Sequence, residues 1–197
     1  MKITDITLAT HNEHKLKEFS DFFAPLGIKI HSEKEFCDLK DVEETGKTYF
    51  ENALLKAKAI KPYSPFPVLA DDSGIEIEAL GEHFPGIFTA RYLDTLSPNR
   101  IKALNILLDQ LKDNPNRKAA FHCTLLLLEE EKETAFEGIC EGEILKDIKG
   151  KEGFGYDPIF HCFEGNANFG EISEEEKMLY SHRGKALQKL FAYLKEE

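Results

Sequence analysis

The 197-residue sequence contains no tryptophan and only four cysteines: Cys37, Cys123, Cys140 and Cys162. No two of them stand in CxxC spacing, and no group of cysteines and histidines has the spacing of a zinc finger. A disulfide framework and a structural zinc site are therefore both unexpected. Scattered, reduced thiols of this kind are typical of a cytosolic protein.

Long apolar runs and an excess of positive charge are also missing. No segment approaches the ~18 consecutive apolar residues of a membrane-spanning helix, and the N-terminal MKITDITLATHNE has neither the apolar core nor the cleavage site of a signal peptide. With 36 acidic and 25 basic residues, the formal net charge is −11, which argues against binding to a nucleic-acid backbone. We expect a cytoplasmic protein that binds neither membrane nor nucleic acid, although a local basic site for a small polyanion is compatible with this charge.

The sequence has enough apolar residues for a full core, since 42% are hydrophobic and 31% are charged. The length suits one domain, or one domain with two lobes. Apolar periodicity predicts strands over residues 3–10, 28–32, 67–71, 75–80, 119–128 and 134–145. Helices are expected after Asn12, after Thr48, from Ser97-Pro98, after Ser173 and over the stretch ending at Leu194. Strands and helices mix without strict alternation, which indicates an α/β protein with a mixed sheet flanked by helices.

The segment Thr10-His11-Asn12-Glu13-His14-Lys15 lies where a strand ends and a helix begins. Unpaired N–H groups at a helix N-terminus favour bound anions, and Lys15 would add a full positive charge one turn into the helix. The alternative is an ordinary Asn12 N-cap followed by a solvated lysine.

A second segment, EETGKT, spans residues 43–48. It is not a P-loop, because Asp41 stands where that motif requires its first glycine. Glu43 and Glu44 are instead acids in a loop ahead of a helix, and Lys56 lies about two turns into that helix. These charges could serve a ligand or could simply form a solvated face.

Two adjacent carboxylates, Asp71 and Asp72, follow the apolar run Val68-Leu69-Ala70. Ligands often bind at the carboxyl ends of strands in α/β sheets. Adjacent carboxylates repel each other, and Mg²⁺ can offset their charge while also binding substrate phosphates. In the alternative interpretation, Asp71 caps a turn at this point and Asp72 faces water.

Two further segments carry groups suited to a nucleotide. In GFGYDP (residues 153–158), glycines flank aromatic residues, so that the backbone can approach a flat ligand on which a ring stacks. A tight structural turn is the alternative. In SHRG (residues 181–184), His182 and Arg183 carry N–H donors for carbonyl or phosphate oxygens. Together the segments suit one ligand with phosphates, a metal and a planar base.

The order of these blocks resembles the inosine triphosphate pyrophosphatase family, which acts on non-standard purine nucleoside triphosphates. The resemblance is carried by THNEHK, EETGKTYFENALLKAKA, LADDSGIEIEAL, PGIFTARY, GFGYDPIF and SHRGKAL, and it spans residues 10–187. FGYDP and SHRG at this separation from ADDSG form a specific combination.

This resemblance implies a Mg²⁺-dependent hydrolase that cleaves ITP, dITP or XTP to the nucleoside monophosphate and pyrophosphate, and so removes these compounds from the nucleotide pool. It implies an elongated α/β fold in a single domain over residues 1–197, with two lobes, a central cleft and a homodimeric assembly.

Site residues follow by match to the family's motifs. Catalysis would involve Asp72 as proton acceptor, together with Lys56 and Lys15. The metal ligands would be Glu43 and Asp72. The substrate-binding set would comprise Thr10, His11, Asn12, Glu13, His14, Lys15, Ser73, Phe154, Gly155, Tyr156, Asp157, Lys177, His182 and Arg183. The roles of Asp71 and Arg91 stay open.

Two other functions compete with this one. A related pyrophosphatase could prefer another base, such as a modified pyrimidine or uracil. A non-catalytic nucleotide sensor or RNA-binding module is the rival from a different class. The net charge of −11 counts against RNA, and the full set of acids and lysines counts against a binding protein without activity.

Overall fold

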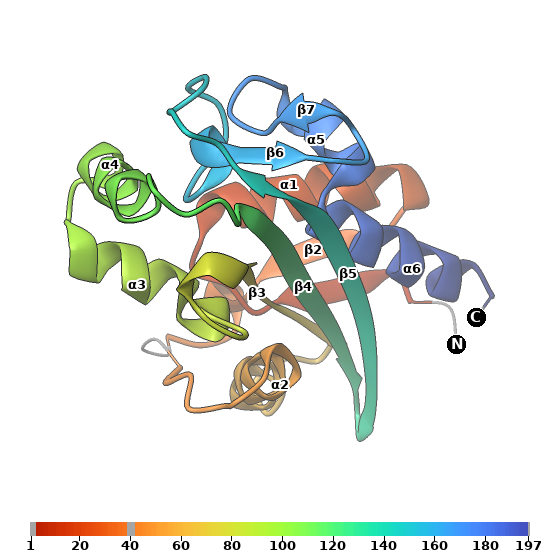
Figure 1. Cartoon of the computed structure of the whole chain (residues 1–197). Helices are drawn as coiled ribbons and strands as arrows, with labels where there is room; N and C mark the ends of the chain where they lie inside the picture. The colour runs from red at the N-terminus through yellow and green to blue at the C-terminus, as the bar shows by residue number, and fades with distance from the viewer. Residues whose placement is uncertain (1–2, 39–41, 197) are drawn as a thin grey trace. The chain divides into compact units, whose positions relative to one another are not determined.

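The chain forms a mixed seven-stranded sheet with six α-helices in a computed structural model that describes residues 3–38 and 42–196 (Figure 1). The strand order is β2-β1-β3-β4-β5-β6-β7. The strands are β1 (Asp5–Leu8), β2 (Lys29–Ser32), β3 (Val68–Ile77), β4 (Lys118–Glu129), β5 (Lys132–Ile144), β6 (Phe160–Cys162) and β7 (Ala167–Asn168). The helices are α1 (Glu13–Phe23), α2 (Tyr49–Ile60), α3 (Thr89–Leu96), α4 (Arg100–Gln110), α5 (Glu174–Tyr180) and α6 (His182–Glu196). The predicted α/β class with a mixed sheet is confirmed.

The chain divides into two compact units. The first contains the described residues up to Asp72, together with residues 124–136 and those from Ala186 onward. The second contains residues 73–123 and 137–185. The predicted cleft, the elongated shape and the single domain stay predictions.

The first unit is built on parallel strands. β1 pairs in parallel with β2 and with β3. Apolar residues of α2, including Ala53 and Ala57, share a buried cluster with Val68 of β3 and with Leu126 and Leu128 of β4. Burying such side chains is the main stabilising term, at roughly 25 cal/mol per Å² of apolar surface. This packing holds α2 against the strand that carries Asp71 and Asp72.

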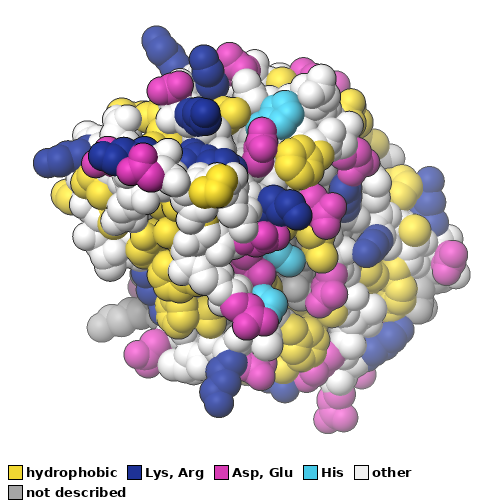
Figure 2. Space-filling view, in the orientation of Figure 1, with side chains coloured by type: hydrophobic (Ala, Val, Ile, Leu, Met, Phe, Trp, Pro, Cys, Tyr) yellow, Lys and Arg dark blue, Asp and Glu magenta, His cyan; other side chains and the backbone are white. Residues whose placement is uncertain are grey.

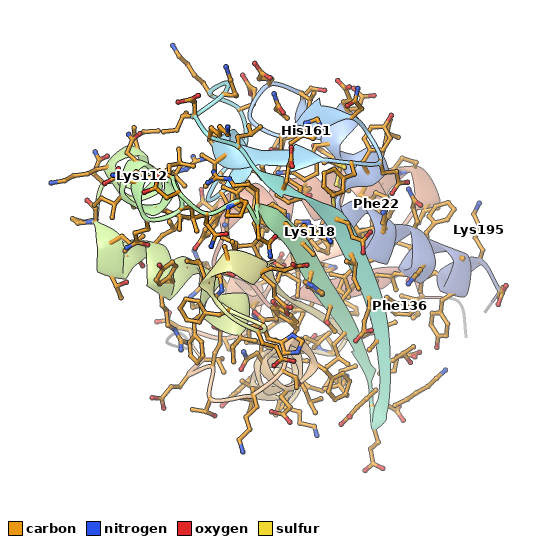
Figure 3. The ribbon with its side chains drawn as sticks, in the orientation of Figure 1. Phe22, Lys112, Lys118, Phe136, His161 and Lys195 are labelled. Carbon is orange, nitrogen blue, oxygen red and sulfur yellow. The ribbon has the colours of Figure 1, made fainter. Side chains whose placement is uncertain are left out.

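From Ala186 onward, α6 belongs to the first unit, where two aromatic side chains of the helix pack against α1 and β5. Phe191 of α6 meets Phe22 of α1 with ring centroids 6.2 Å apart, and Tyr193 meets Phe136 of β5 at 5.4 Å. Figure 3 labels both phenylalanines, Phe22 and Phe136. The first pair is edge-to-face and the second is tilted. Aromatic pairs add about 0.5–1.5 kcal/mol beyond burial, so both help to anchor the C-terminal helix.

The second unit has its own core, in which Ile75 and Ile77 of β3 join Leu104 and Leu107 of α4. α3 and α4 lie side by side as a helical hairpin (Figure 1). β6 pairs antiparallel with β5 and with β7. His161 of β6, labelled in Figure 3, hydrogen-bonds through Nδ1 with Asn168 Oδ1 of β7 at 2.8 Å.

Helix ends follow the local sequence signals closely. α1 is followed by a 3₁₀ turn over Ala24–Leu26, and Gly27 ends it in the left-handed region at φ 67°. The Thr48 hydroxyl caps α2 by accepting from the Glu51 N–H at 3.1 Å. The Glu51 carboxylate in turn accepts from the Lys47 N–H. α4 begins at Arg100 behind the cap of Asn99, two residues later than Ser97-Pro98 suggested.

The strand predictions need one correction at the centre of the chain. Residues 67–71 and 75–80 were expected as two strands, but β3 runs without a break over Val68–Ile77. Asp71 and Asp72 are 2% and 8% exposed. The interpretation in which Asp71 caps a turn and Asp72 faces water is therefore wrong, because both carboxylates lie inside a buried strand.

Other elements were partly or wholly missed. The sequence analysis expected no helix at α3 and no strands at β6 and β7, which are only three and two residues long. In β4, residues 123–128 are continuously buried, as is usual for a strand covered on both faces, whereas residues 118–122 alternate. The helix after Ser173 is confirmed, with the Ser173 hydroxyl accepting from the Glu176 N–H.

His31 of β2 gives the first unit a testable pH dependence. Its ring is 6% exposed, stacks on Phe66, and bonds the carboxylates of Asp5 and Glu35 at 2.8 and 3.0 Å. Burial acts to lower the pKa of His31, but the bonds to Asp5 and Glu35 outweigh burial and the nearby Lys29, so the net shift is upward. A raised pKa means that this stabilisation is complete below the unfolded pKa of about 6.5 and is lost as pH rises through the folded pKa.

We expect the melting temperature of the wild type to fall more steeply between pH 6 and pH 9 than that of His31→Gln. Charge-assisted hydrogen bonds contribute about 1–3 kcal/mol, and each kcal/mol corresponds to about 2–4 °C in a chain of this size. Thermal melts at several pH values measure the difference, with His161→Gln as control, because His161 bonds the uncharged Asn168. Parallel pH profiles for wild type and His31→Gln would contradict this account.

Candidate active site

Asp72 is a buried carboxylate with a strongly raised pKa. Burial raises its pKa to about 6, against the opposing charge of Lys56. Its Oδ2 accepts from the Asn52 side-chain amide at 3.1 Å, and its Oδ1 lies 3.4 Å from Lys56 Nζ. A raised pKa makes a carboxylate a better proton acceptor near neutral pH.

Lys56 of α2 is surrounded by acids. Its Nζ bonds Glu44 Oε1 at 3.0 Å, and the charges of Asp71, Asp72 and Glu44 raise its pKa although burial opposes them. Lys56 and Asn52 lie one turn apart on α2, so both reach β3 from the same helix face. Lys56 is therefore held as a cation among three carboxylates.

Lys15 connects the start of α1 to the same strand. Its Nζ donates to both oxygens of Asp71, at 3.1 and 2.8 Å, and this ion pair is largely buried. The pair explains how β3 tolerates two adjacent acids, since Asp71 and Asp72 each have a lysine from a different helix. The structure thus brings Lys15, Lys56, Asp71 and Asp72 together in one unit.

The turn before α1 has the contacts of an N-cap. Asn12 Oδ1 accepts from the Lys15 N–H at 3.3 Å, and the Asn12 N–H donates to Thr10 Oγ1 at 3.2 Å. His11 Nε2 forms an ion-pair contact with the buried Glu33. Asn12 and Glu13 are exposed at the helix start, whereas the side chain of His14 lies outside the described part of the structure.

In the second unit, the loop Gly153–Asp157 is a tight, defined turn. Gly153 and Gly155 have φ of 69° and 55°, which other residues rarely adopt. A Cβ on Gly153 would lie 2.2 Å from Asp157 Oδ2. Tyr156 points inward, and its hydroxyl donates to the Thr89 carbonyl at 2.9 Å. The structural-turn interpretation is therefore correct for the backbone, and it leaves the Phe154 ring 51% exposed.

Asp157 and Lys177 form a buried ion pair under this loop. Lys177 Nζ donates to Asp157 Oδ2 at 2.8 Å, and the two side chains are 5% and 3% exposed. Burial raises the pKa of Asp157, while Lys177 and the Phe154 N–H act to lower it. Lys177 Nζ also lies 4.8 Å from the centroid of the Phe154 ring, a cation–π distance.

The residues of SHRG lie at the start of α6, in the second unit. His182 is buried and stacks on Phe121 with ring centroids 4.8 Å apart. The Arg183 guanidinium lies 5.7 Å from the Phe154 ring, and its Nη2 donates to Ser73 Oγ at 3.5 Å. The second unit therefore brings together Ser73, Phe154, Asp157, Lys177 and Arg183.

Glu43 does not join the acids around Lys56. Its side chain is exposed, whereas the neighbouring Glu44 contacts Lys56. Within residues 3–38 and 42–196, no three side chains among Asp, Glu, His and Cys are arranged to hold a metal ion. The assignment of Glu43 as a metal ligand stays a prediction, and Glu44 is the loop acid that the structure places near Asp72.

Two residues escaped the sequence analysis. Asn52 is 1% exposed, and its side chain links the Gly46 N–H to Asp72, which ties the acidic loop to β3. Its signal was a polar residue on an apolar helix face, one turn before Lys56. Arg100 bonds two carbonyls of the glycine-rich loop, and nothing local to residue 100 indicates this. Arg91 is exposed, with its guanidinium 5.9 Å from the Phe88 ring.

The chain combines a mixed sheet with paired acids on a buried strand and a glycine-aromatic loop. These features together define a known class of proteins. The chain belongs to the Ham1 family, whose sequence model matches residues 6–193. The resemblance inferred from the sequence motifs is thereby confirmed.

Individual relatives agree with this placement. A Coxiella burnetii protein named dITP/XTP pyrophosphatase is 40% identical over 198 residues, which cover 98% of this chain and 97% of that protein. A Streptococcus agalactiae protein of the same name is 42% identical over 189 residues, and the matched region spans only 58% of its length.

Solved structures show the same fold. A HAM1 protein from Coxiella burnetii superposes with a TM-score of 0.88 at 38% identity, covering 99% of this chain and all of that one. The Staphylococcus aureus Ham1 protein gives 0.85 at 34% identity, with 98% of both chains covered.

Proposed function

We propose that this protein hydrolyses non-standard purine nucleoside triphosphates, dITP, ITP and XTP, to the nucleoside monophosphate and pyrophosphate. The observation that carries the proposal is the pair of lysine-bound acids, Asp71 and Asp72, on one buried strand. The names of the relatives, dITP/XTP pyrophosphatase, support the substrate class. The reaction removes such nucleotides from the pool.

The reacting end of the substrate is assigned to the first unit. Lys15, Lys56 and the backbone N–H groups that follow Thr10 would bind the phosphates and stabilise the charge that moves onto the leaving pyrophosphate. Asp72, with its pKa raised to about 6 by burial, would accept a proton from the attacking water. This chemistry rests on positioning and electrostatics, and no covalent nucleophile is needed.

The donor set of the first unit fits a divalent cation. Burial raises the pKa of Asp72 even beside Lys56, so negative charge there is incompletely offset. Mg²⁺ usually takes one or two protein carboxylates and completes its shell with water and phosphate oxygens. Asp72 and Glu43 would hold the ion, which supplies positive charge at the phosphate oxygens.

The base is assigned to the second unit. Hypoxanthine and xanthine carry a carbonyl at C6, and N–H donors from Arg183, His182 or the loop backbone would pair with it. Adenine carries an amine at that position, which would leave those donors unpaired. Hydrogen-bonding sites of this kind discriminate by about 10⁴-fold, so ATP is expected to be a poor substrate.

The proposal also includes the oligomeric state of the protein and its location in the cell. We propose a cytoplasmic homodimer, on the basis of the family resemblance and the cysteine usage. Among the described residues, no helix is both long and apolar enough to cross a membrane. Figure 2 shows basic and acidic side chains interspersed on the displayed face. The net charge of −11 leads us to propose that the protein does not bind nucleic acid. Sedimentation velocity would measure the assembly state.

Pyrophosphate release from a panel of triphosphates tests the proposal. The panel contains dITP, ITP, XTP, GTP, ATP and dUTP, each with Mg²⁺ and with excess EDTA. We expect release from dITP, ITP and XTP, a kcat/KM for ATP about 10⁴-fold lower, and no release in EDTA until Mg²⁺ is restored. Comparable turnover of ATP and ITP would contradict the donor-pairing account, and preference for dUTP would favour an enzyme for another base.

A further inference from the structure

Arg100 holds the glycine-rich loop of the second unit from the start of α4. Its Nε donates to the Gly155 carbonyl at 3.0 Å, and its Nη1 donates to the Gly153 carbonyl at 3.3 Å. These carbonyls lie on either side of Phe154. One planar guanidinium therefore bridges the backbone on both sides of the exposed ring.

Arg100 is committed to this contact at some cost. Its Nη2 is buried and has no hydrogen-bond partner among the described residues, and leaving a buried donor unpaired is unfavourable. Burial lowers the pKa of Arg100, and the charge of Asp157 opposes that shift. The guanidinium thus donates to two carbonyls of the loop, although one of its own nitrogen donors stays unpaired.

The loop backbone contains two intrinsically flexible residues, so contacts from outside the turn help to hold it in one conformation. Gly153 and Gly155 both have positive φ, and glycines lose the most conformational entropy when they are held in one state. Within the turn itself, the side chain of Asp157 accepts from the Phe154 N–H at 2.7 Å. Arg100 and Asp157 together hold the three groups that decide where the Phe154 ring points: its own N–H and the two flanking carbonyls.

We propose that Arg100 is a positioning residue for the nucleobase: it fixes the loop so that the half-exposed Phe154 ring meets the planar base. The inference rests on the proposed function, since Phe154 is assigned there to substrate. Arg100 acts through the loop that carries Phe154, so it affects binding of the base and leaves the chemical step unchanged.

Kinetics on dITP test this role. Arg100→Met, which keeps the aliphatic stem but removes the donors, is expected to raise KM about tenfold with kcat within twofold, since base binding is equal in ground and transition states. Arg100→Lys can bond only one of the two carbonyls and should fall between. Arg117 provides a matched control, because it also donates to backbone carbonyls, those of Ile144 and Leu111, away from the loop. Arg117→Lys should leave KM unchanged.

A double-mutant cycle separates positioning from general stability. In a Phe154→Ala background, Arg100→Met should add no further increase in KM, because the group it positions is gone. Independent, multiplying effects of the two substitutions would overturn the proposal, as would an unchanged KM for Arg100→Met alone.

Hydrogen exchange gives a readout that does not depend on activity. Exchange of the Phe154 and Asp157 amides should accelerate at least tenfold in Arg100→Met and stay unchanged in Arg117→Lys. If the unmodified protein released no pyrophosphate from any triphosphate, the proposed function would fail, and exchange would still decide whether Arg100 holds the loop. Unchanged exchange in Arg100→Met would overturn the clamp itself.

Discussion

Asp72→Asn is expected to lower kcat for dITP by about 10³-fold, within the range typical of removing a general base. Asparagine keeps the volume of the side chain and can still accept from the Asn52 amide, but it cannot take a proton from water. The fold should survive, because folding raises the pKa of Asp72 to about 6. A carboxyl with a raised pKa destabilises the fold once it ionises, so replacing it by a neutral group should not lower stability at pH 7.

Initial rates at saturating dITP measure this effect, with melting temperature as the check on folding. Asp71→Asn is the sharpest comparison, since Asp71 is equally buried on the same strand but is bound to Lys15. Its effect on kcat should be at least tenfold smaller. The exposed Asp109→Asn on α4 should behave as wild type. A kcat for Asp72→Asn within a factor of five of wild type would exclude Asp72 as the proton acceptor.

Lys177→Met is expected to have the largest effect on stability, at about 3–5 kcal/mol, because it leaves the Asp157 charge buried without its partner. A loss of this size lowers the melting temperature by about 10 °C in a chain of this length. The deficit should shrink as pH falls. The pKa of Asp157 is already raised by burial, and without Lys177 its carboxyl would take up a proton more readily, which removes the unpaired charge.

Urea unfolding at pH 7 and pH 5 measures this deficit, and the double variant Lys177→Met/Asp157→Asn tests its cause. Asparagine can still accept from the Phe154 N–H, so the double variant should recover more than half of the lost stability. The exposed Lys102→Met on α4 controls for loss of a lysine elsewhere in the same unit. If the double variant were no more stable than Lys177→Met, the unpaired charge would not be the reason for the loss.

Local signals predicted much of the secondary structure. The helices expected after Thr48 and after Ser173 begin there, because each start depends on hydrogen bonds within four residues. α3 and β6 were missed because α3 is short and capped by no side-chain hydrogen bond, and three residues of strand carry no detectable period.

The sequence predicted several side chains of the candidate site, but it did not indicate all of the residues that contact them. Asp72, Lys56 and Lys15 were expected to act together, and they do lie in one cluster of contacts. Glu43 and Glu44 are chemically identical neighbours, so the sequence could not indicate which of them turns toward Lys56. The path of the loop decides this, and Asn52 contributes through its bond to the Gly46 N–H.

The sequence by itself determined the family and the helix starts after Thr48 and Ser173, because motifs and caps are short-range features. Only the tertiary structure decided that Asp71 and Asp72 lie inside one continuous buried strand, and that Arg100 clamps a loop more than fifty residues away along the chain. Those contacts depend on where packing brings distant segments together, and no local pattern encodes the route that the backbone takes between them.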